Sequence, residues 1–181
     1  NGRTGCFCAR CRDLFARRVG RSLDADWPKR LKEGAELDRA WCEFRRETIS
    51  QVVREVSERV RREHSAVRIS AFVFEGPAIK IDLYGQDWPQ WLKFDIVDYV
   101  APMDYTSSIS KFRELLAQQA SLSTRAKRTI IGIGVTANES KLNAEEVNQQ
   151  VALARQCGFA GQALFKLDDR LVQKILPTVW R

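Results

Sequence analysis

The feature that most constrains the fold is a regular alternation of strand-like and helix-like patterns from residue 44 onward. Apolar stretches rich in β-branched and aromatic residues predict four strands, at 67–74, 96–103, 129–135 and 159–167. Helical spacing and capping residues predict helices at 44–63, 88–93, 108–122 and 144–156, with a last one from Asp168 or Asp169 to the residue before Pro177. Because strands that alternate with helices form parallel βαβ units, we expect an α/β fold with the strands side by side in chain order and helices on one face.

The length of the chain limits how much of this architecture it can form. Its 181 residues suffice for one hydrophobic core, so we expect a single domain over 1–181. Within it, 1–43 is a loop and helix region rich in cysteine and arginine, and 44–181 holds the β/α units. A complete (β/α)8 barrel needs about 250 residues, and four parallel strands leave two open sheet edges, so a barrel made of these units would be partial. Since the chain begins at Asn1 and not at Met, we interpret it as a fragment or a processed product.

The formal net charge of +7 comes mainly from arginines, many of them before residue 65. Such an excess could form a patch for nucleic acid or another polyanion. However, the segment 54–63 mixes arginines with glutamates, as on the solvated face of a helix, and basic residues do not interleave with aromatic ones as in RNA-binding segments. The sequence therefore favours solvated helix faces over a nucleic-acid partner. No apolar stretch of the sequence is long enough to span a bilayer, so no membrane partner is expected.

Two carboxylates stand directly after neighbouring predicted strands. Glu75 follows the strand at 67–74, and Asp104 follows the strand at 96–103. Neighbouring strands lie about 5 Å apart and parallel strands end at the same edge, so we expect both side chains to project into one cleft. Glycoside hydrolysis needs such a pair, one group as acid and the other as base or nucleophile. The alternative for each carboxylate is a structural role, as a helix N-cap or in a loop.

The segment 85–92 combines groups that suit sugar binding. An indole such as that of Trp88 can stack on a sugar ring, and the amide of Gln86 can bind hydroxyl groups. Asp87 precedes Trp88 and Pro89 at a predicted helix start, a position typical of an N-cap residue. We therefore treat Gln86, Asp87 and Trp88 as candidate substrate-binding residues, with helix capping as the alternative for Asp87.

Other polar residues follow the predicted strands and so occupy the expected rim of the cleft. Tyr105 comes after the second strand, where it could bind substrate or tune a neighbouring carboxylate. Asn138 and Glu139 follow the third strand, and Lys166 and Asp168 close the fourth. A lysine in an otherwise apolar strand either points into the cleft or pairs with a carboxylate. Tyr105, Asn138 and Lys166 complete the candidate substrate-binding set.

Three cysteines gather near the N-terminus, namely Cys6, Cys8 and Cys11. Thiolates at this spacing suit a soft metal ion, with Cys42 as a candidate fourth ligand. The alternatives are a disulfide or buried free thiols. We expect no cofactor other than a structural zinc ion at these three residues. The chain holds five cysteines, an odd number, which leaves its redox compartment open.

The motifs GQDWPQW at 85–91 and DYVAPMDYT at 98–106 resemble those of the family 10-like hypothetical glycosyl hydrolases, a group of bacterial (β/α)8 barrels. The stretches FRRETI at 44–49 and VRISAFVF at 67–74 fit the same family, so the resemblance covers most of 41–106. It implies that the chain forms strands 5–8, the C-terminal half of a TIM barrel, with the N-terminal half upstream. It also implies that the cysteine segment is a structural knuckle after strand 4, and that the protein is extracellular or periplasmic.

The carboxylates and the resemblance together favour a glycoside hydrolase-like domain that acts on an oligo- or polysaccharide by acid/base chemistry. Glu75 and Asp104 are the expected catalytic residues. The half-barrel alone is not expected to be active, because a further catalytic group would lie upstream. A non-catalytic barrel that binds carbohydrate with Gln86, Trp88 and Tyr105 is the first alternative, and a polyanion- or nucleic-acid-binding domain is the second. The expected partners are a carbohydrate and the missing N-terminal half of the barrel.

Overall fold

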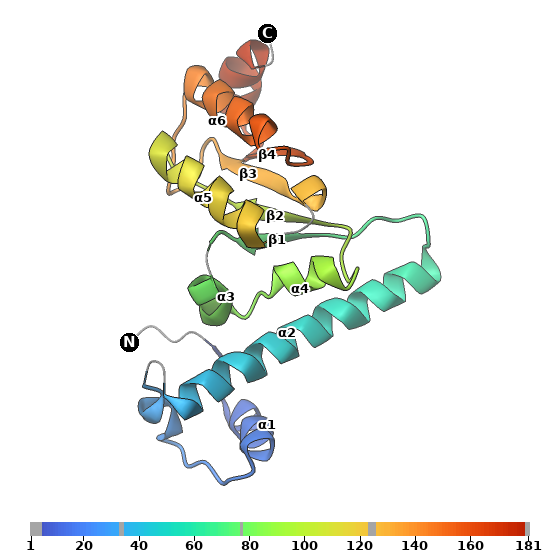
Figure 1. Ribbon diagram of the computed structural model, residues 1–181, viewed down its shortest axis with the longest axis vertical. Helices are drawn as coiled ribbons and strands as arrows, with labels where there is room; N and C mark the ends of the chain where they lie inside the picture. The colour runs from blue at the N-terminus through green and yellow to red at the C-terminus, as the bar shows by residue number, and fades with distance from the viewer. Residues whose placement is uncertain (1–4, 33–34, 77, 123–125, 180–181) are drawn as a thin grey trace.

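A parallel sheet of four strands forms the centre of the computed structural model, which describes residues 5–32, 35–76, 78–122 and 126–179 (Figure 1). The strands are β1 (Ser70–Phe74), β2 (Tyr99–Met103), β3 (Ile130–Gly134) and β4 (Gly161–Phe165), adjacent in that order. All three pairings are parallel, with Ser70 opposite Tyr99, Met103 opposite Gly132 and Ile130 opposite Gly161. The predicted α/β fold and the order of its strands are confirmed.

The described ranges contain six α-helices: α1 (Ala9–Val19), α2 (Glu36–Glu63), α3 (Ala78–Tyr84), α4 (Trp88–Lys93), α5 (Ile109–Leu122) and α6 (Ala144–Gln156). Short helical segments lie between or after these elements: η1 (Trp27–Arg30), η2 (Ala126–Arg128), η3 (Leu171–Ile175) and η4 (Leu176–Thr178). The predictions for α4, α5 and α6 agree with these bounds to within a residue. Asp168 caps the last helical segment, as predicted, because its Oδ1 accepts the N–H of Leu171 at 2.8 Å.

Helix α2 begins earlier than the sequence predicted, at Glu36 instead of residue 44. Its first turns belong to a separate aromatic cluster formed with α1 and η1, whose buried members are Phe15, Leu23, Trp27, Leu31 and Trp41. Trp41 is 1% exposed, so burial of its large ring stabilises the additional turns of α2. The region predicted as a cysteine- and arginine-rich loop and helix therefore has a small hydrophobic core.

Helix α3 lies between β1 and α4, where the sequence predicted no helix. It stands between Gly76 and Gly85, and Gly85 follows its last turn with a φ of +73°. Contacts from α2 hold α3 in place: Arg45 donates to the Leu83 carbonyl at 2.7 Å, and Arg46 pairs with Asp82 at 2.7 Å. Since these partners are distant in the sequence, local patterns could not reveal the helix.

In the described part of the chain, the helices that pack on the sheet lie on one side of it (Figure 1). Buried residues of β1, β2 and α4 form one cluster against α2, and it includes Val73, Val100, Trp88, Trp91 and Leu92. Buried residues of β3, α5 and α6 form a second cluster, which includes Ile131, Ile133, Phe112, Leu116 and Val147. This arrangement agrees with the predicted helices on one face.

The other side of the sheet, here called the open face, carries exposed aromatic residues. Phe72 is 57% exposed and Phe165 41%, whereas Val73, which points to the helices, is fully buried. The strands β1 and β4 are at the ends of the sheet, so each has one unpaired edge within the described residues. An open apolar face and two open edges give this chain the form of a partial TIM barrel.

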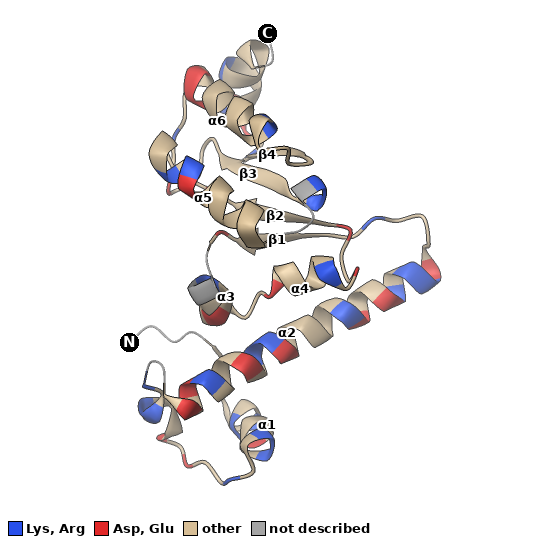
Figure 2. Ribbon diagram, viewed as in Figure 1, with Lys and Arg blue, Asp and Glu red and all other residues tan. Residues whose placement is uncertain are grey.

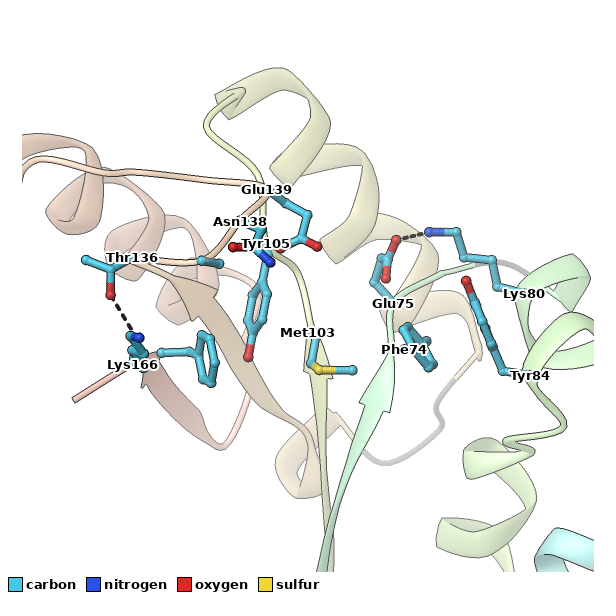
Figure 3. A pocket seen from close by; sticks show the side chains of 12 residues that line it. Phe74, Glu75, Lys80, Tyr84, Met103, Tyr105, Thr136, Asn138, Glu139 and Lys166 are labelled. Carbon is cyan, nitrogen blue, oxygen red and sulfur yellow. Dashed lines mark hydrogen bonds and ion pairs between the residues drawn. The ribbon is translucent and has the colours of Figure 1, made fainter. Parts of the chain in front are cut away.

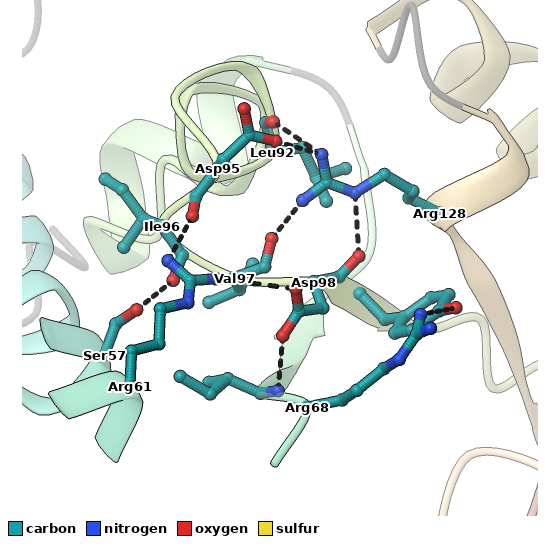
Figure 4. Close-up of polar contacts among 11 residues, drawn as sticks. Ser57, Arg61, Arg68, Leu92, Asp95, Ile96, Val97, Asp98 and Arg128 are labelled. Atoms are coloured by element: carbon teal, nitrogen blue, oxygen red, sulfur yellow. Dashed lines mark hydrogen bonds and ion pairs between the residues drawn. The ribbon is translucent and has the colours of Figure 1, made fainter. Parts of the chain in front are cut away.

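The amino ends of the strands are held together by charged side chains around the loop between α4 and β2 (Figure 4). Arg128 donates to the Asp98 carbonyl at 2.8 Å and pairs with Asp95 at 2.5 Å. The Asp98 carboxylate accepts the N–H of Ile69 at 2.7 Å, and Arg61 of α2 donates to the Asp95 carbonyl at 2.6 Å. These bonds satisfy backbone groups that neither sheet nor helix pairs, so this end of the sheet serves stability.

The arginines of α2 lie among carboxylates along the whole helix (Figure 2). Arg59 pairs with Glu63 one turn later at 3.0 Å, and Glu47 pairs with Arg18 of α1 at 2.6 Å. This mixture agrees with the predicted solvated helix face. Across the described ranges, no helix combines the length and apolar character that a membrane crossing requires.

Candidate functional site

A cavity of about 520 Å³ opens at the carboxyl ends of the strands (Figure 3). Its lining comes from the ends of the strands, the loops that follow them and α3: Phe74, Glu75, Lys80, Tyr84, Met103, Tyr105, Thr136, Ala137, Asn138, Glu139, Phe165 and Lys166. In barrels of parallel strands this edge carries the functional groups, because loops of variable sequence meet there on a rigid sheet. Four predicted site residues meet in this cavity, namely Glu75, Tyr105, Asn138 and Lys166.

Two stacked aromatic pairs stand on opposite sides of the cavity (Figure 3). On one side the rings of Phe74 and Tyr84 lie 3.8 Å apart at an interplanar angle of 16°. On the other side Tyr105 stacks on Phe165 at 5.1 Å and 16°. Met103 of β2 lies between the two pairs. Flat aromatic surfaces of this kind offer large contact areas to the apolar faces of a ring-shaped ligand.

Glu75 and Lys80 form an ion pair at the β1 side of the cavity. Glu75 directly follows β1, and the first turns of α3 bring Lys80 back over it. Burial lowers the pKa of Lys80, the nearby charge of Lys111 lowers it further, and Asp104 opposes both effects. The pair therefore presents one negative and one positive group to the cavity, each still partly open to solvent.

Polar groups from the ends of β3 and β4 form the opposite side. Asn138 and Glu139 lie exposed in the loop after β3, and Figure 3 shows the Glu139 carboxyl turned toward the cavity. Burial raises the pKa of Tyr105, and the charges of Glu139 and Asp104 raise it further, so the phenol keeps its proton and can donate a hydrogen bond. Lys166 is anchored at its backbone, where its N–H donates to the Thr136 hydroxyl at 3.4 Å.

The structure places Asp104 between the sheet and α5 and not in the cavity. Its side chain is fully buried, and its Oδ1 accepts the amide of Gln119 at 2.5 Å. Burial raises the pKa of Asp104 to about 8, against the opposing effects of the Gln119 hydrogen bond and the charge of Lys80. The reason is the alternation of side chains along β2: Val100 and Asp104 face the helices, whereas Met103 and Tyr105 reach the cavity. This position does not support the predicted catalytic role.

The candidates at 86–88 also lie outside the cavity lining. Trp88 is fully buried in the cluster beneath β1 and β2, so no face of its indole is available to a sugar ring. Gln86 accepts the N–H of Phe74 at 2.8 Å and so positions the end of β1. Asp87 stands at the N-cap position of α4 and borders a different hollow, between α2 and α4. Trp88 is buried because α4 packs on the outside of the sheet with its aromatic side inward.

The cysteine cluster lies at the start of α1, away from the cavity lining. The Sγ atoms of Cys6, Cys8 and Cys11 all lie within 4.8 Å of one another. Cys8 is the N-cap residue of α1 and Cys11 lies within the helix, so the segment that the family resemblance implied to be a structural knuckle includes the start of a helix. Cys42 is buried in α2 and is not a member of this group of sulfur atoms.

Sequence reasoning missed several groups of the cavity. Lys80 and Tyr84 lie on α3, which the sequence did not predict, and Phe74 and Phe165 fall within predicted strands. One signal was available: Phe72 and Phe74 are two residues apart in one strand and so share a face of the sheet. That face differs from the face of Val73, which packs on the helices.

The described residues thus form part of a TIM barrel, with carboxylates, a lysine and aromatic rings at the carboxyl edge of its sheet. The chain belongs to the glycosyl hydrolase-like 10 family, whose model matches residues 26–153. The family resemblance seen in the sequence motifs is thereby confirmed. Family membership relates the chain to glycoside hydrolase-like proteins.

Among solved structures, the glycoside hydrolase domain of PgaB (BpsB) from Bordetella bronchiseptica has a similar fold, with a TM-score of 0.71 at 16% sequence identity. The similarity covers 88% of this chain and 47% of the other, so this chain spans about half the length of that domain. At this identity the likeness shows the fold alone. Comparison with curated proteins found no match.

Proposed function

We propose that the cavity at the carboxyl ends of the strands binds an oligo- or polysaccharide and takes part in its hydrolysis. The observation that carries this proposal is the combination of two stacked aromatic pairs with carboxylates on both sides of one cavity. Sugar rings present apolar C–H faces and a rim of hydroxyl groups. The aromatic pairs suit the former, and Asn138, Lys166 and Tyr105 suit the latter.

We assign the catalytic roles in hydrolysis to the two carboxylates that reach the cavity, Glu75 and Glu139. Glycoside hydrolysis uses one carboxyl group as the acid for the leaving oxygen and a second as base or nucleophile. Lys80 balances the charge of Glu75, so both carboxylates can occupy one cavity with less mutual repulsion. Asp104 is then a buried structural group next to the site. Its hydrogen bond with Gln119 joins the end of β2, directly before Tyr105, to α5.

The same proposal includes a covering half-barrel. The open face exposes Phe72 in the middle of β1, and the outer edges of β1 and β4 lack partners within the described residues. Four further parallel strands would pair with both edges and bury the open face, as a closed barrel of eight strands requires. In this arrangement the chain supplies strands 5–8, and the covering half adds further groups to the cavity. An extracellular or periplasmic location is part of this proposal.

The test uses the complete barrel, meaning a protein that contains both this chain and its covering half. We expect Glu75→Gln and Glu139→Gln each to lower the rate of polysaccharide cleavage about 10²- to 10⁴-fold, because each removes a proton-transfer or nucleophilic group. Glu145→Gln is the matched control, since Glu145 is an exposed glutamate in the first turn of α6 and does not line the cavity.

Thermal melting of each variant separates loss of chemistry from loss of fold. Unchanged cleavage by both cavity variants would remove these carboxylates from the mechanism. If the wild type binds oligosaccharide but never cleaves it, and Tyr84→Ala weakens that binding, the site is a non-catalytic carbohydrate-binding site.

A further inference from the structure

The sulfur atoms of three cysteines meet at the start of α1, outside the proposed carbohydrate site. Cys6 and Cys8 are exposed, Cys11 is half-buried, and all three are free thiols. Their Sγ atoms all lie within 4.8 Å of one another. Two sulfurs bound to one zinc ion at about 2.3 Å in a tetrahedron lie about 3.8 Å apart. The three thiols are therefore close to the spacing that a shared metal ion requires.

The backbone that carries the thiols is anchored to the aromatic core of α1, η1 and α2. Phe7, between Cys6 and Cys8, stacks on Trp41 with ring centroids 5.5 Å apart at 27°, and meets Trp27 edge-on, also at 5.5 Å. A Cβ atom added to Gly5 would lie 3.2 Å from the Trp41 ring, so the chain passes close over this core. The contacts of the partly exposed Phe7 ring with this core hold the segment from one side, while the cysteines on either side of it remain accessible.

Helix α1 fixes the positions of Cys8 and Cys11, and Cys6 lies two residues before its N-cap. Cys8 precedes the helix as its N-cap residue, and Cys11 lies three residues later, so their side chains share one face of the first turn. The half-buried Cys11 packs against the aromatic core. Two sulfurs on the first turn of α1 and a third on the segment held by Phe7 form a preorganised set of ligands, which lowers the entropic cost of closing a metal site.

The charges near the cluster suit thiolate ligands. The first turn of α1 has no acidic residue, Arg10 and Arg12 lie between and beside the cysteines, and the N-terminus of the helix favours negative charge. Three thiolates around a divalent cation carry one net negative charge, and these positive groups stabilise it. Hard cations such as Mg²⁺ and Ca²⁺ prefer oxygen ligands, so sulfur selects a softer ion.

We propose that Cys6, Cys8 and Cys11 bind one zinc ion through three thiolates, with the fourth position open to water or an external ligand. Cys42 does not belong to the group, so the site differs from the four-cysteine arrangement that the sequence suggested. The exposed Cys6 and Cys8 leave a path by which the ion enters. Bound zinc would join the segment before α1 to the first turn of the helix and so stabilise the small aromatic core.

The test measures metal binding to the full chain. Purified protein is reduced, freed of metal and loaded with Zn²⁺, and its zinc content is measured after desalting. We expect about one zinc ion per chain in the wild type and a loss of at least about 10-fold in affinity for Cys8→Ser, which removes one of three ligands. Cys157→Ser is the matched control, because Cys157 is an exposed free cysteine at the end of α6.

A second readout needs no variant and so does not depend on whether Cys8→Ser folds. Cobalt(II) in place of zinc should give the intense near-ultraviolet absorption of thiolate-to-metal charge transfer, and zinc should protect three of the five thiols from a thiol reagent. Equal reactivity of all thiols with and without zinc, or no charge-transfer band with cobalt, would overturn the proposal. A disulfide between two of the three cysteines in the protein as isolated, with no metal bound after reduction, would also overturn it.

Discussion

Asp104 shows how strongly its surroundings change a single carboxyl group. It has the chemical type of a catalytic residue and stands at the end of a strand, yet it is fully buried beside Gln119. With its pKa raised to about 8 by burial, it keeps its proton at neutral pH and acts as a neutral link between β2 and α5. Glu75, at the end of the neighbouring strand, remains accessible and paired with Lys80. The two carboxylates look alike in the sequence and differ in burial.

This difference gives a pH-dependent prediction for stability. Between pH 4 and pH 8 folded Asp104 retains a proton that the unfolded chain has lost, so its contribution to stability is full at low pH and falls as pH rises toward about 8. The slope is up to about 1.4 kcal/mol per pH unit. Asp104→Asn removes the titration and can keep the hydrogen bond to Gln119. We expect the variant to gain stability relative to the wild type as pH rises, measured by urea unfolding. A stability difference that does not change with pH would show that Asp104 is not held protonated.

At the scale of elements, α3 forms the β1 side of the cavity, and Gly85 allows the chain to leave it. Gly85 has a φ of +73°, and a Cβ atom there would lie 2.7 Å from Cδ1 of Ile49 in α2. A side chain at this position would therefore meet backbone strain, and the end of the Ile49 side chain would have to move to accept it. The close contact brings α3, with Lys80 and Tyr84, over the end of β1.

Two glycines with nearly the same backbone conformation separate these effects. Gly158 has a φ of +74° but no atom within 4 Å of an added Cβ, so Gly158→Ala measures backbone strain alone. We expect Gly158→Ala to cost about 1 kcal/mol of unfolding free energy and Gly85→Ala about 2–4 kcal/mol, because overpacking adds to strain. Chemical denaturation of both variants gives the comparison. Equal losses would mean that α2 moves to accept the methyl group, and that the contact does not position α3.

The elements also show which parts of the structure local sequence can predict. The capping box at Asn143 and Glu146 and the apolar spacing of 144–156 predicted α6 correctly, because these signals act within one helix. Helix α3 and the early start of α2 depend on contacts with distant residues such as Arg45 and Phe15, and no local pattern carries them. The predicted parallel order of the strands correctly located the cavity at their carboxyl ends. Which of these residues point into the cavity depends on which face of β2 packs on the helices, and the sequence alone did not show that.

At the scale of the whole molecule, the open face of the sheet is the main feature that the described residues leave without a packing partner. Phe72 is 57% exposed there, and an exposed aromatic residue in the middle of a strand is typical of a surface that another element covers. We expect Phe72→Ala to cost about 3–5 kcal/mol in the complete barrel, as for a buried phenylalanine. Phe94→Ala is the matched control, because Phe94 is 61% exposed at the end of α4, on the helix side. Thermal or urea unfolding of both variants measures the difference. Equally small losses would contradict the covering half-barrel.

The central claim is that the cavity at the carboxyl ends of the strands is the carbohydrate site. Its most direct test is a crystal structure of the complete barrel, with Glu75→Gln and a bound oligosaccharide. We predict sugar rings against the Phe74–Tyr84 and Tyr105–Phe165 pairs, with residue 75 and Glu139 within hydrogen-bonding distance of the sugar. An oligosaccharide bound elsewhere, for example in the hollow between α2 and α4 beside Asp87, with the cavity empty, would contradict the claim.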